Sequence, residues 1–255
     1  MDAFYLPEGD RFVSTQWTRG PWDPGAQHAG PPAALTARAI EALEPGWQVA
    51  RFTFEILRSI PVAPLSVDAR VSRPGRRVQF CEASLRTDEH EVARAHVWRI
   101  RPGDGTTPTT PAEPPPFAGP AELGAMNMPD LGGASYFAGM EWRAVRGTFL
   151  EPGPATVWMR MRVPLLPDEE PSPLSRVLAA ADSGNGISRE LDPGSHFFIN
   201  TELSVHLTRM PVREWVCLDA VTRMDPSGIG LATTVLYDER ARIGIGNQSL
   251  LIAER

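Results

Sequence analysis

Asp182 is the residue whose surroundings point most directly to chemistry. It lies in Ala181-Asp182-Ser183-Gly184-Asn185, inside a small, apolar stretch with a helical pattern. A carboxylate in such a place is costly to bury without partners, so it is exposed, hydrogen-bonded or functional. A solvent-facing side chain and the cap of a broken helix are the two simpler interpretations. Gly184 is unfavourable inside a helix by about 1 kcal/mol, which indicates close approach of a ligand or of another backbone.

Three polar residues on predicted strands could hold a water molecule or a carbonyl group. Gln248 lies in the last predicted strand; facing inward it offers an amide donor and acceptor, and facing outward it is ordinary surface. Within residues 200–207, alternation puts Thr201 on the apolar, buried face and Asn200 on the polar face. A β-bulge would change which face of the strand each of these side chains takes.

His28 stands just before the first predicted helix, in Gln27-His28-Ala29-Gly30. Free N–H groups at a helix N-terminus favour an anion or a developing oxyanion, so His28 and Gly30 are candidate substrate-binding residues. A plain loop histidine is the alternative. The five histidines lack metal-ligand spacing, and two cysteines are too few for a cysteine-based metal site or a disulfide framework. The sequence therefore predicts no metal.

The elements that must position these residues follow the same order twice. The first half has a helix pattern at 33–43, after Pro31-Pro32, and strand patterns at 52–57, 65–71, 78–85 and 91–100. The second half has a strand pattern at 156–163 and a helix pattern at 172–191, with further strands at 197–207, 215–222, 228–237 and 242–252. Each half thus predicts one helix followed by a four-stranded antiparallel meander.

A single long helix is buried when a curved sheet wraps around it. The predicted fold class is therefore α+β, a double hotdog in which two antiparallel sheets each surround a central helix and join as a pseudo-dimer. A proline-rich stretch at 102–120 cannot continue a strand or helix and is typical of a linker. The predicted domains are residues 1–115 and 116–255, the second carrying the catalytic candidates.

Composition excludes several function classes. The net charge is −6 and the chain holds no lysine, which argues against nucleic-acid or anionic-membrane binding and against Schiff-base or P-loop chemistry. No segment reads as a signal peptide or a membrane span, so we expect a cytoplasmic protein.

The quoted motifs resemble the acyl-CoA thioesterase II (TesB-like) family of double-hotdog thioesterases over nearly the whole chain. In that family, an Asp on the second central helix, a Thr or Asn on the next strand and a Gln on the last strand position the hydrolytic water. Asp182 and Gln248 match the first and third positions. Anchoring on Arg209 puts the middle position on Asn200, with Thr201 one residue away. Gln27-His28-Ala29-Gly30 resembles the family's glycine-containing segment, often His-Gly-Gly, with Ala29 replacing one glycine.

The resemblance implies acyl-CoA hydrolysis in lipid metabolism without a metal or cofactor. Asp182 would activate water as general base, or attack directly; Asn200 or Thr201 and Gln248 would orient the water. N–H groups near Gly30 would stabilise the oxyanion. Asp182 has no acidic counterpart in the first half, so the resemblance implies one competent site, with the first half supplying surface and a pantetheine tunnel.

Other functions are compatible with the same fold. A catalytically silent acyl-CoA or acyl-carrier binding protein is the alternative, because fold does not determine function. A hydratase is disfavoured because the Asp182 segment lacks the proline and histidine of the Asp-x-Asn-Pro-x-His pattern. The expected partner is a small-molecule acyl-CoA, and further pairing into a homo-oligomer is left open.

Overall fold

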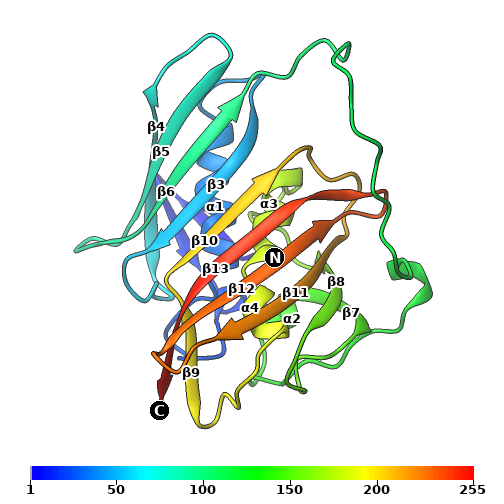
Figure 1. Cartoon of the computed structure of the whole chain (residues 1–255). Coiled ribbons are helices and arrows are strands. Elements are labelled where there is room, and N and C mark those ends of the chain that lie inside the picture. The colour runs from blue at the N-terminus through cyan, green and yellow to red at the C-terminus, as the bar shows by residue number, and fades with distance from the viewer. Residues whose placement is uncertain (1) are drawn as a thin grey trace.

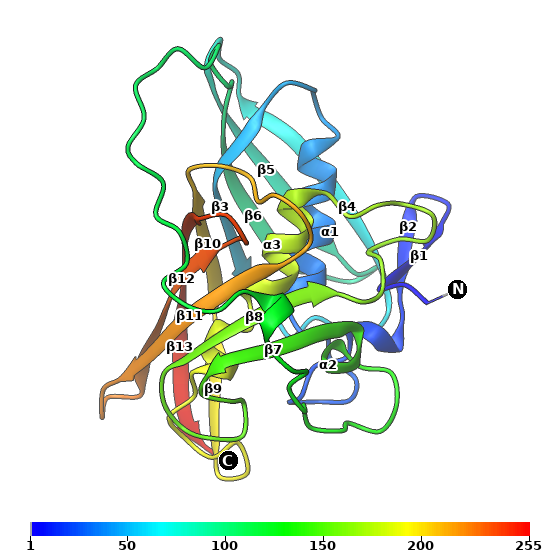
Figure 2. The same ribbon diagram turned by 90° about the vertical axis from the view of Figure 1, so that its right-hand side faces the viewer.

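Within residues 2–255, the part of the chain that the computed structural model describes, thirteen strands form one curved antiparallel sheet (Figure 1). The order along the sheet is β1-β2-β4-β5-β6-β3-β10-β13-β12-β11-β8-β7, and β9 pairs with β13 off this path. Figure 2 shows α1 and α3 on the same side of the sheet. The strands are β1 (Tyr5–Glu8), β2 (Arg11–Ser14), β3 (Gln48–Ile56), β4 (Pro64–Arg73), β5 (Val78–Arg86), β6 (Glu91–Ile100), β7 (Met140–Arg146), β8 (Ala155–Met161), β9 (His196–Asn200), β10 (Glu202–Leu207), β11 (Val216–Met224), β12 (Ile229–Tyr237) and β13 (Arg242–Glu254). The helices are α1 (Gly30–Glu41), α2 (Tyr136–Gly139), α3 (Pro173–Ala181) and α4 (Gly184–Ile187), with short 3-10 turns at Gln16–Thr18 and Pro120–Glu122.

Helix α1 begins at Gly30, three residues before the predicted start of the helix at 33–43. Pro31 and Pro32 lie in its first turn, where a missing backbone N–H costs nothing, and the alanine-rich body that follows is buried. The helix packs on β4 and β5 on one side and on α3 on the other. The small alanine side chains allow α1 to lie close both to the sheet and to α3, its neighbour on the same face.

The helix predicted at 172–191 is wrong as a single element, because the chain forms two helices there. Ser172 caps α3, its hydroxyl oxygen accepting from the Ser175 N–H at 3.0 Å, and Pro173 opens the first turn. The helix ends at Ala181, and α4 starts two residues beyond Asp182. Asp182 therefore lies at a break between two helices.

The predicted meander is also wrong in its pairing. All eight segments predicted as strands after the helices contain strand, but the one predicted at 197–207 is divided at Thr201 into β9 and β10. In the first half β4, β5 and β6 form a meander, but β3 pairs with β6 instead of β4. The second half repeats this pattern, since β10 pairs with β13 at the end of β11-β12-β13. Local alternation predicts strands but carries no information about which strand lies next to which.

Strands β3 and β10 join the two halves of the sheet, side by side at its middle (Figure 1). They are antiparallel, with Ser204 opposite Thr53, and the Ser204 hydroxyl lies 3.2 Å from the Thr53 hydroxyl oxygen. The proline-rich stretch forms neither helix nor strand between 101 and 119; it is exposed as far as residue 114, and beyond that Phe117 packs against the buried cluster of Trp158 and Tyr237. The chain thus connects its halves twice, through this segment and through the sheet.

Gly30 allows α1 and α3 to meet. A methyl group at this position would lie 2.4 Å from the carbonyl oxygen of Ala179, in the last turn of α3. Since that atom is backbone, one helix would have to move.

We expect Gly30→Ala to lower the free energy of unfolding by about 2 kcal/mol, in the range of overpacked core sites. Chemical denaturation measures this. Gly103→Ala is the matched control, because an added methyl there meets nothing within 4 Å. Equal stability of the two variants would show that the helices separate freely at Gly30.

Candidate active site

Asp182 is buried at the break between α3 and α4. Its side chain is 3% exposed, so the exposed alternative considered from the sequence is wrong. It is the residue that follows the last turn of α3, as the broken-helix alternative required. A carboxylate in this position must accept hydrogen bonds from other elements to remain ionised.

Three side chains from separate parts of the chain surround this carboxylate. Asn200, at the end of β9, donates through Nδ2 to Oδ1 at 2.8 Å, and Gln248, on β13, donates through Nε2 to the same oxygen at 3.2 Å. His28 lies on the other side, with Nδ1 3.0 Å from Oδ2. We call these four residues the Asp182 cluster. The structure therefore brings together Asp182, Asn200, Gln248 and His28, all of which the sequence singled out.

Gln248 also bridges the helix break. Its Nε2 donates to the Asp182 carbonyl at 3.0 Å, and its Oε1 accepts from the Asn185 N–H at 2.9 Å. One side-chain amide thus satisfies a carbonyl at the end of α3 and an N–H at the start of α4. With 1% exposure and these bonds made, Gln248 holds the two helix ends and the carboxylate in a fixed relation.

Gly184 is the residue that lets α4 lie against the sheet. A methyl group there would come within 2.5 Å of the Thr234 hydroxyl oxygen and 3.0 Å of Gln248 Oε1. The sequence predicted close approach of a ligand or of another backbone at Gly184; the atoms that the structure places there belong to side chains. The glycine permits the contact between Gln248 and the helix break.

Thr201 does not join the cluster, and its predicted burial is wrong. Its side chain is exposed and donates to the Ser249 carbonyl at 3.3 Å. The cause is a register shift: Asn200 lies opposite Leu250 on β13, whereas Ser204 lies opposite Asn247. The segment from Asn200 to Ser204 therefore holds one residue more than the segment of β13 opposite it. This is the β-bulge that would change the alternation, and it turns Asn200 toward Asp182.

His28 has one ring nitrogen between two neighbours. Nδ1 accepts from the Gly30 N–H at 3.2 Å when it carries no proton, and it faces Asp182 Oδ2 when it carries one. Burial lowers the pKa of His28, and the nearby Asp182 carboxylate raises it in part. The effect of burial is the larger of the two, so the His28 pKa lies below its usual value and the imidazole is neutral at pH 7.

Sequence reasoning missed Tyr136 and Ser183. The Tyr136 ring stacks on the His28 ring with centroids 3.6 Å apart and an interplanar angle of 8°. Its hydroxyl lies 2.8 Å from Ser183 Oγ, next to Asp182. Tyr136 is 108 positions from His28 in the numbered sequence and belongs to no motif, so no local pattern could reveal it.

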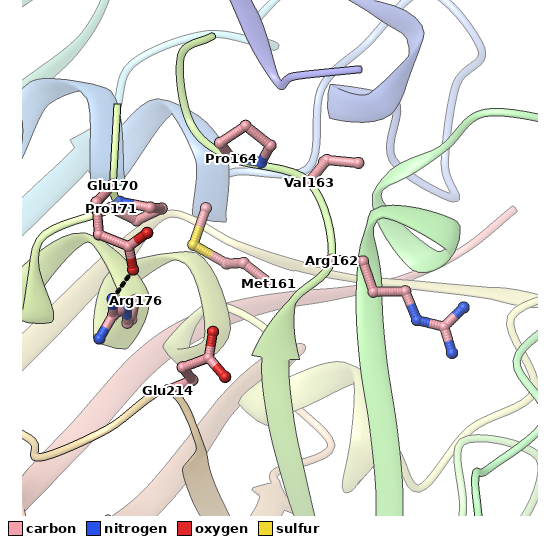
Figure 3. Close-up of a pocket in the computed structure, with 8 residues that line it drawn as sticks. All are labelled: Met161, Arg162, Val163, Pro164, Glu170, Pro171, Arg176 and Glu214. Carbon is pink, nitrogen blue, oxygen red and sulfur yellow. Dashed lines mark hydrogen bonds and ion pairs between the residues drawn. The ribbon is translucent and has the colours of Figure 1, made fainter. Parts of the chain in front are cut away.

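A pocket elsewhere on the molecule has a different character (Figure 3). It is lined by the end of β8, the segment 162–164, and by Glu170, Pro171, Arg176 and Glu214. Glu170 and Arg176 are paired with each other there. No member of the Asp182 cluster lines this pocket.

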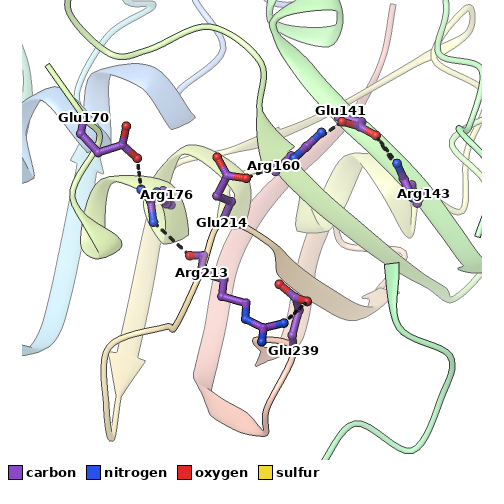
Figure 4. Close-up of polar contacts among 8 residues, drawn as sticks. All are labelled: Glu141, Arg143, Arg160, Glu170, Arg176, Arg213, Glu214 and Glu239. Atoms are coloured by element: carbon purple, nitrogen blue, oxygen red, sulfur yellow. Dashed lines mark hydrogen bonds and ion pairs between the residues drawn. The ribbon is translucent and has the colours of Figure 1, made fainter. Parts of the chain in front are cut away.

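A network of arginines and glutamates extends beside that pocket (Figure 4). Glu141 accepts from both Arg143 and Arg160, each at 2.7 Å, and Arg160 also reaches Glu214 at 3.1 Å. Among the eight residues drawn, each arginine side chain is matched by a glutamate. Because its charges are already paired, the network connects β7, β8 and the segment before β11 and leaves no free cation for an anion.

Three further findings concern the described residues. Between residues 2 and 255 no group of three or more His, Cys, Asp or Glu side chains could hold a metal ion. No helix of that part of the chain is long and apolar enough to cross a membrane. Cys81 and Cys217 are buried and free.

Comparison with known proteins identifies the class. Three solved structures cover nearly the whole chain: a hot dog fold protein of unknown function from Alicyclobacillus acidocaldarius (15% identity, TM-score 0.75, 98% of this chain and 95% of that one), the tesB protein of Mycobacterium avium subs paratuberculosis (16%, 0.71, 98% and 96%) and the acyl-CoA thioesterase II TesB2 of Mycobacterium marinum (16%, 0.66, 97% and 93%). At these identities the likeness is one of fold. The protein has a hot dog fold.

The family follows from the sequence matches. The model of the acyl-CoA thioesterase N-terminal domain matches residues 18–100, and that of the C-terminal domain matches residues 109–252. No curated protein sequence matches. The chain belongs to the acyl-CoA thioesterase family and is a thioester hydrolase.

Proposed function

We propose that the Asp182 cluster hydrolyses an acyl-CoA thioester with water activated by Asp182. The observation that carries this proposal is the placement of one buried carboxylate among Asn200, Gln248 and His28, drawn from four separate segments. A carboxylate has about four lone-pair positions, and three are engaged or faced by these side chains. We assign the fourth to the hydrolytic water.

The reaction balances with the residues present. Asp182 takes a proton from water as the water oxygen bonds to the thioester carbon, giving a tetrahedral oxyanion. The oxyanion is stabilised by the Gly30 N–H, because Pro31 and Pro32 carry none, and this N–H is free when the neutral His28 ring carries its single proton on Nδ1. The intermediate then breaks its carbon–sulfur bond, and Asp182 returns the proton to the CoA thiolate. The products are the free acid and CoA.

Asn200 and Gln248 have a positioning role in this proposal. Both donate to Oδ1, which leaves Oδ2 as the oxygen that takes the proton. Thr201 and Gly184, candidates from the sequence, have no direct part, because Thr201 is exposed and Gly184 serves contact with the sheet. The first half contributes more than surface, since His28 comes from it.

The remaining sequence predictions belong to this proposal. We propose a double hotdog, its halves meeting at β3 and β10 and divided near residue 115, supported by the repeated strand pairing and by the contact of α1 with α3. A cofactor-free reaction, a role in lipid metabolism, a cytoplasmic location and homo-oligomer formation stay predictions.

The proposal is tested by release of free thiol from short, medium and long acyl-CoAs. We expect turnover without added metal, and with isotopically labelled water the label should enter the free acid in a single turnover. Label appearing instead on Asp182 would indicate direct attack by the carboxylate. Tight acyl-CoA binding without thiol release would indicate the silent binding protein.

The pH profile provides a separate test. As pH falls through the lowered pKa of His28, the imidazolium forms, pairs with Asp182 and weakens it as a base. We expect kcat/KM to be level at neutral pH and to fall on the acid side, below the usual histidine range. His28→Gln should remove this acid limb and reduce the plateau; an unchanged limb in that variant would assign it to another group.

A further inference from the structure

Tyr136 contacts two parts of the Asp182 cluster: the His28 ring and the segment that carries Asp182. It is fully buried at the start of α2, and its backbone N–H donates to the Arg19 carbonyl at 2.9 Å. The His28 N–H donates to the adjacent Thr18 carbonyl at 2.8 Å. Successive carbonyls of one segment thus hold Tyr136 and His28, and their rings stack.

The hydroxyl of Tyr136 reaches the other half of the cluster. It donates to the Ala179 carbonyl at 2.6 Å, because a carbonyl can only accept, and its single proton is then used. The contact at 2.8 Å with Ser183 must therefore be a bond donated by Ser183. Ala179 and Ser183 flank Asp182 on either side of the helix break, so the phenol ties down the segment that carries the carboxylate.

We propose that Tyr136 is a positioning residue for hydrolysis: its ring sets the plane of His28, and its hydroxyl holds the Asp182 segment, so that Nδ1 and Oδ2 meet. The inference rests on the function proposed above. The stack prevents rotation of the imidazole. Nδ1 therefore stays between the Gly30 N–H and Asp182 Oδ2, where it can change from accepting from Gly30 to donating to Asp182. Tyr136 acts through these neighbours and has no contact with the reacting atoms.

A second feature makes the phenol suited to this role. Burial raises the pKa of Tyr136 far above its usual value, with Asp182 adding to the rise and the bond from Ser183 opposing it. The hydroxyl therefore remains a donor throughout the working pH range. Asp182 and Tyr136 are the titratable groups that face His28, and because the phenol keeps its proton the Asp182 carboxylate is the charge beside the imidazole.

The test separates the ring from the hydroxyl. Tyr136→Phe keeps the stack and loses both hydrogen bonds, Tyr136→Leu loses the stack as well, and Ser183→Ala keeps the phenol. Tyr237→Phe is the matched control, because Tyr237 is a buried phenol in a separate cluster with Trp158 and Phe117. We expect kcat to fall about 10-fold in Tyr136→Phe and about 100-fold in Tyr136→Leu, with KM within 2-fold, from loss of orientation.

Nitrogen NMR of the His28 imidazole supplies a readout that does not depend on activity. We expect Tyr136→Leu to change the tautomer population and to raise the pKa of His28 toward its usual value, since water would enter beside the ring. Tyr237→Phe should leave both the kinetics and these signals unchanged.

Each outcome has one meaning. Native kcat and a native His28 signal in the Tyr136 variants would overturn the inference, and so would equal losses in Tyr136→Phe and Tyr237→Phe, which indicate a general packing role. If the native protein hydrolyses no acyl-CoA, the proposed function fails, while the His28 signals still decide whether Tyr136 sets the imidazole.

Discussion

Asp182→Asn is expected to lower kcat for acyl-CoA hydrolysis by 100-fold to 10,000-fold, roughly the contribution of a general base. The amide has nearly the same shape as the carboxylate but cannot take a proton from water. Its amide oxygen keeps the place of Oδ1, to which Asn200 and Gln248 donate, and its NH2 group takes the place of Oδ2, the oxygen assigned to take the proton. Free-thiol release under saturating acyl-CoA measures the loss directly.

Binding and folding should persist in this variant. KM or the dissociation constant for acyl-CoA should change only a few-fold, because the proposal assigns Asp182 to the chemical step. Asp225→Asn is the matched control: it makes the same chemical change in an exposed turn between β11 and β12, and we expect native turnover. Turnover that survives in Asp182→Asn would show that another group activates the water.

Asp238→Asn is expected to destabilise the fold by about 3 kcal/mol, the range found when one partner of a buried ion pair is removed. The Asp238 side chain is fully buried and accepts two bonds from Arg209, both at 2.6 Å. It also accepts the backbone N–H groups of Val212, Arg240 and Ala241. The variant would place an NH2 group against a guanidinium and leave that charge unpaired. Chemical denaturation at pH 7 measures the loss.

The same carboxylate predicts a pH dependence. Burial by itself raises the pKa of Asp238. The hydrogen bonds from Arg209 and from the backbone have the larger effect and lower this pKa from the usual 3.8 to about 2. Because the folded pKa is depressed, the stabilisation is fully present above 3.8 and is lost as pH falls toward 2. It corresponds to about 2 kcal/mol. The native protein should lose this amount across that window, and Asp238→Asn should not.

A surface ion pair provides the control. Glu82 pairs with Arg70 at 2.6 Å, with the Arg70 side chain 76% exposed. Glu82→Gln should change the free energy of unfolding by less than about 1 kcal/mol. If Asp238→Asn were no worse than Glu82→Gln, the Arg209–Asp238 pair would not be what holds the end of β10 and the turn after β12.

Much of the candidate site could be predicted from single residues that violate their local pattern. Asp182 interrupts an apolar helix, Gly184 weakens it, and Gln248 stands in an apolar strand; each is a local cost that needs a compensating contact. The tertiary contacts supply that compensation as hydrogen bonds between the carboxylate, the amide and the two helix ends. The choice between Asn200 and Thr201 could not be made from alternation, because one extra residue in a strand inverts its phase.

The sequence by itself indicated most of the strands, the starts of the two main helices and the family. Helix starts at Pro31 and Pro173 and the alternation of the strands are properties of neighbouring residues, so they can be read locally. The pairing of β3 with β6, the junction of β3 with β10 and the stacking of Tyr136 on His28 were decided only by the tertiary structure. These contacts join residues tens to more than a hundred positions apart, and their free energy depends on how curved sheet, helices and loops pack together. No local pattern in the chain encodes that packing.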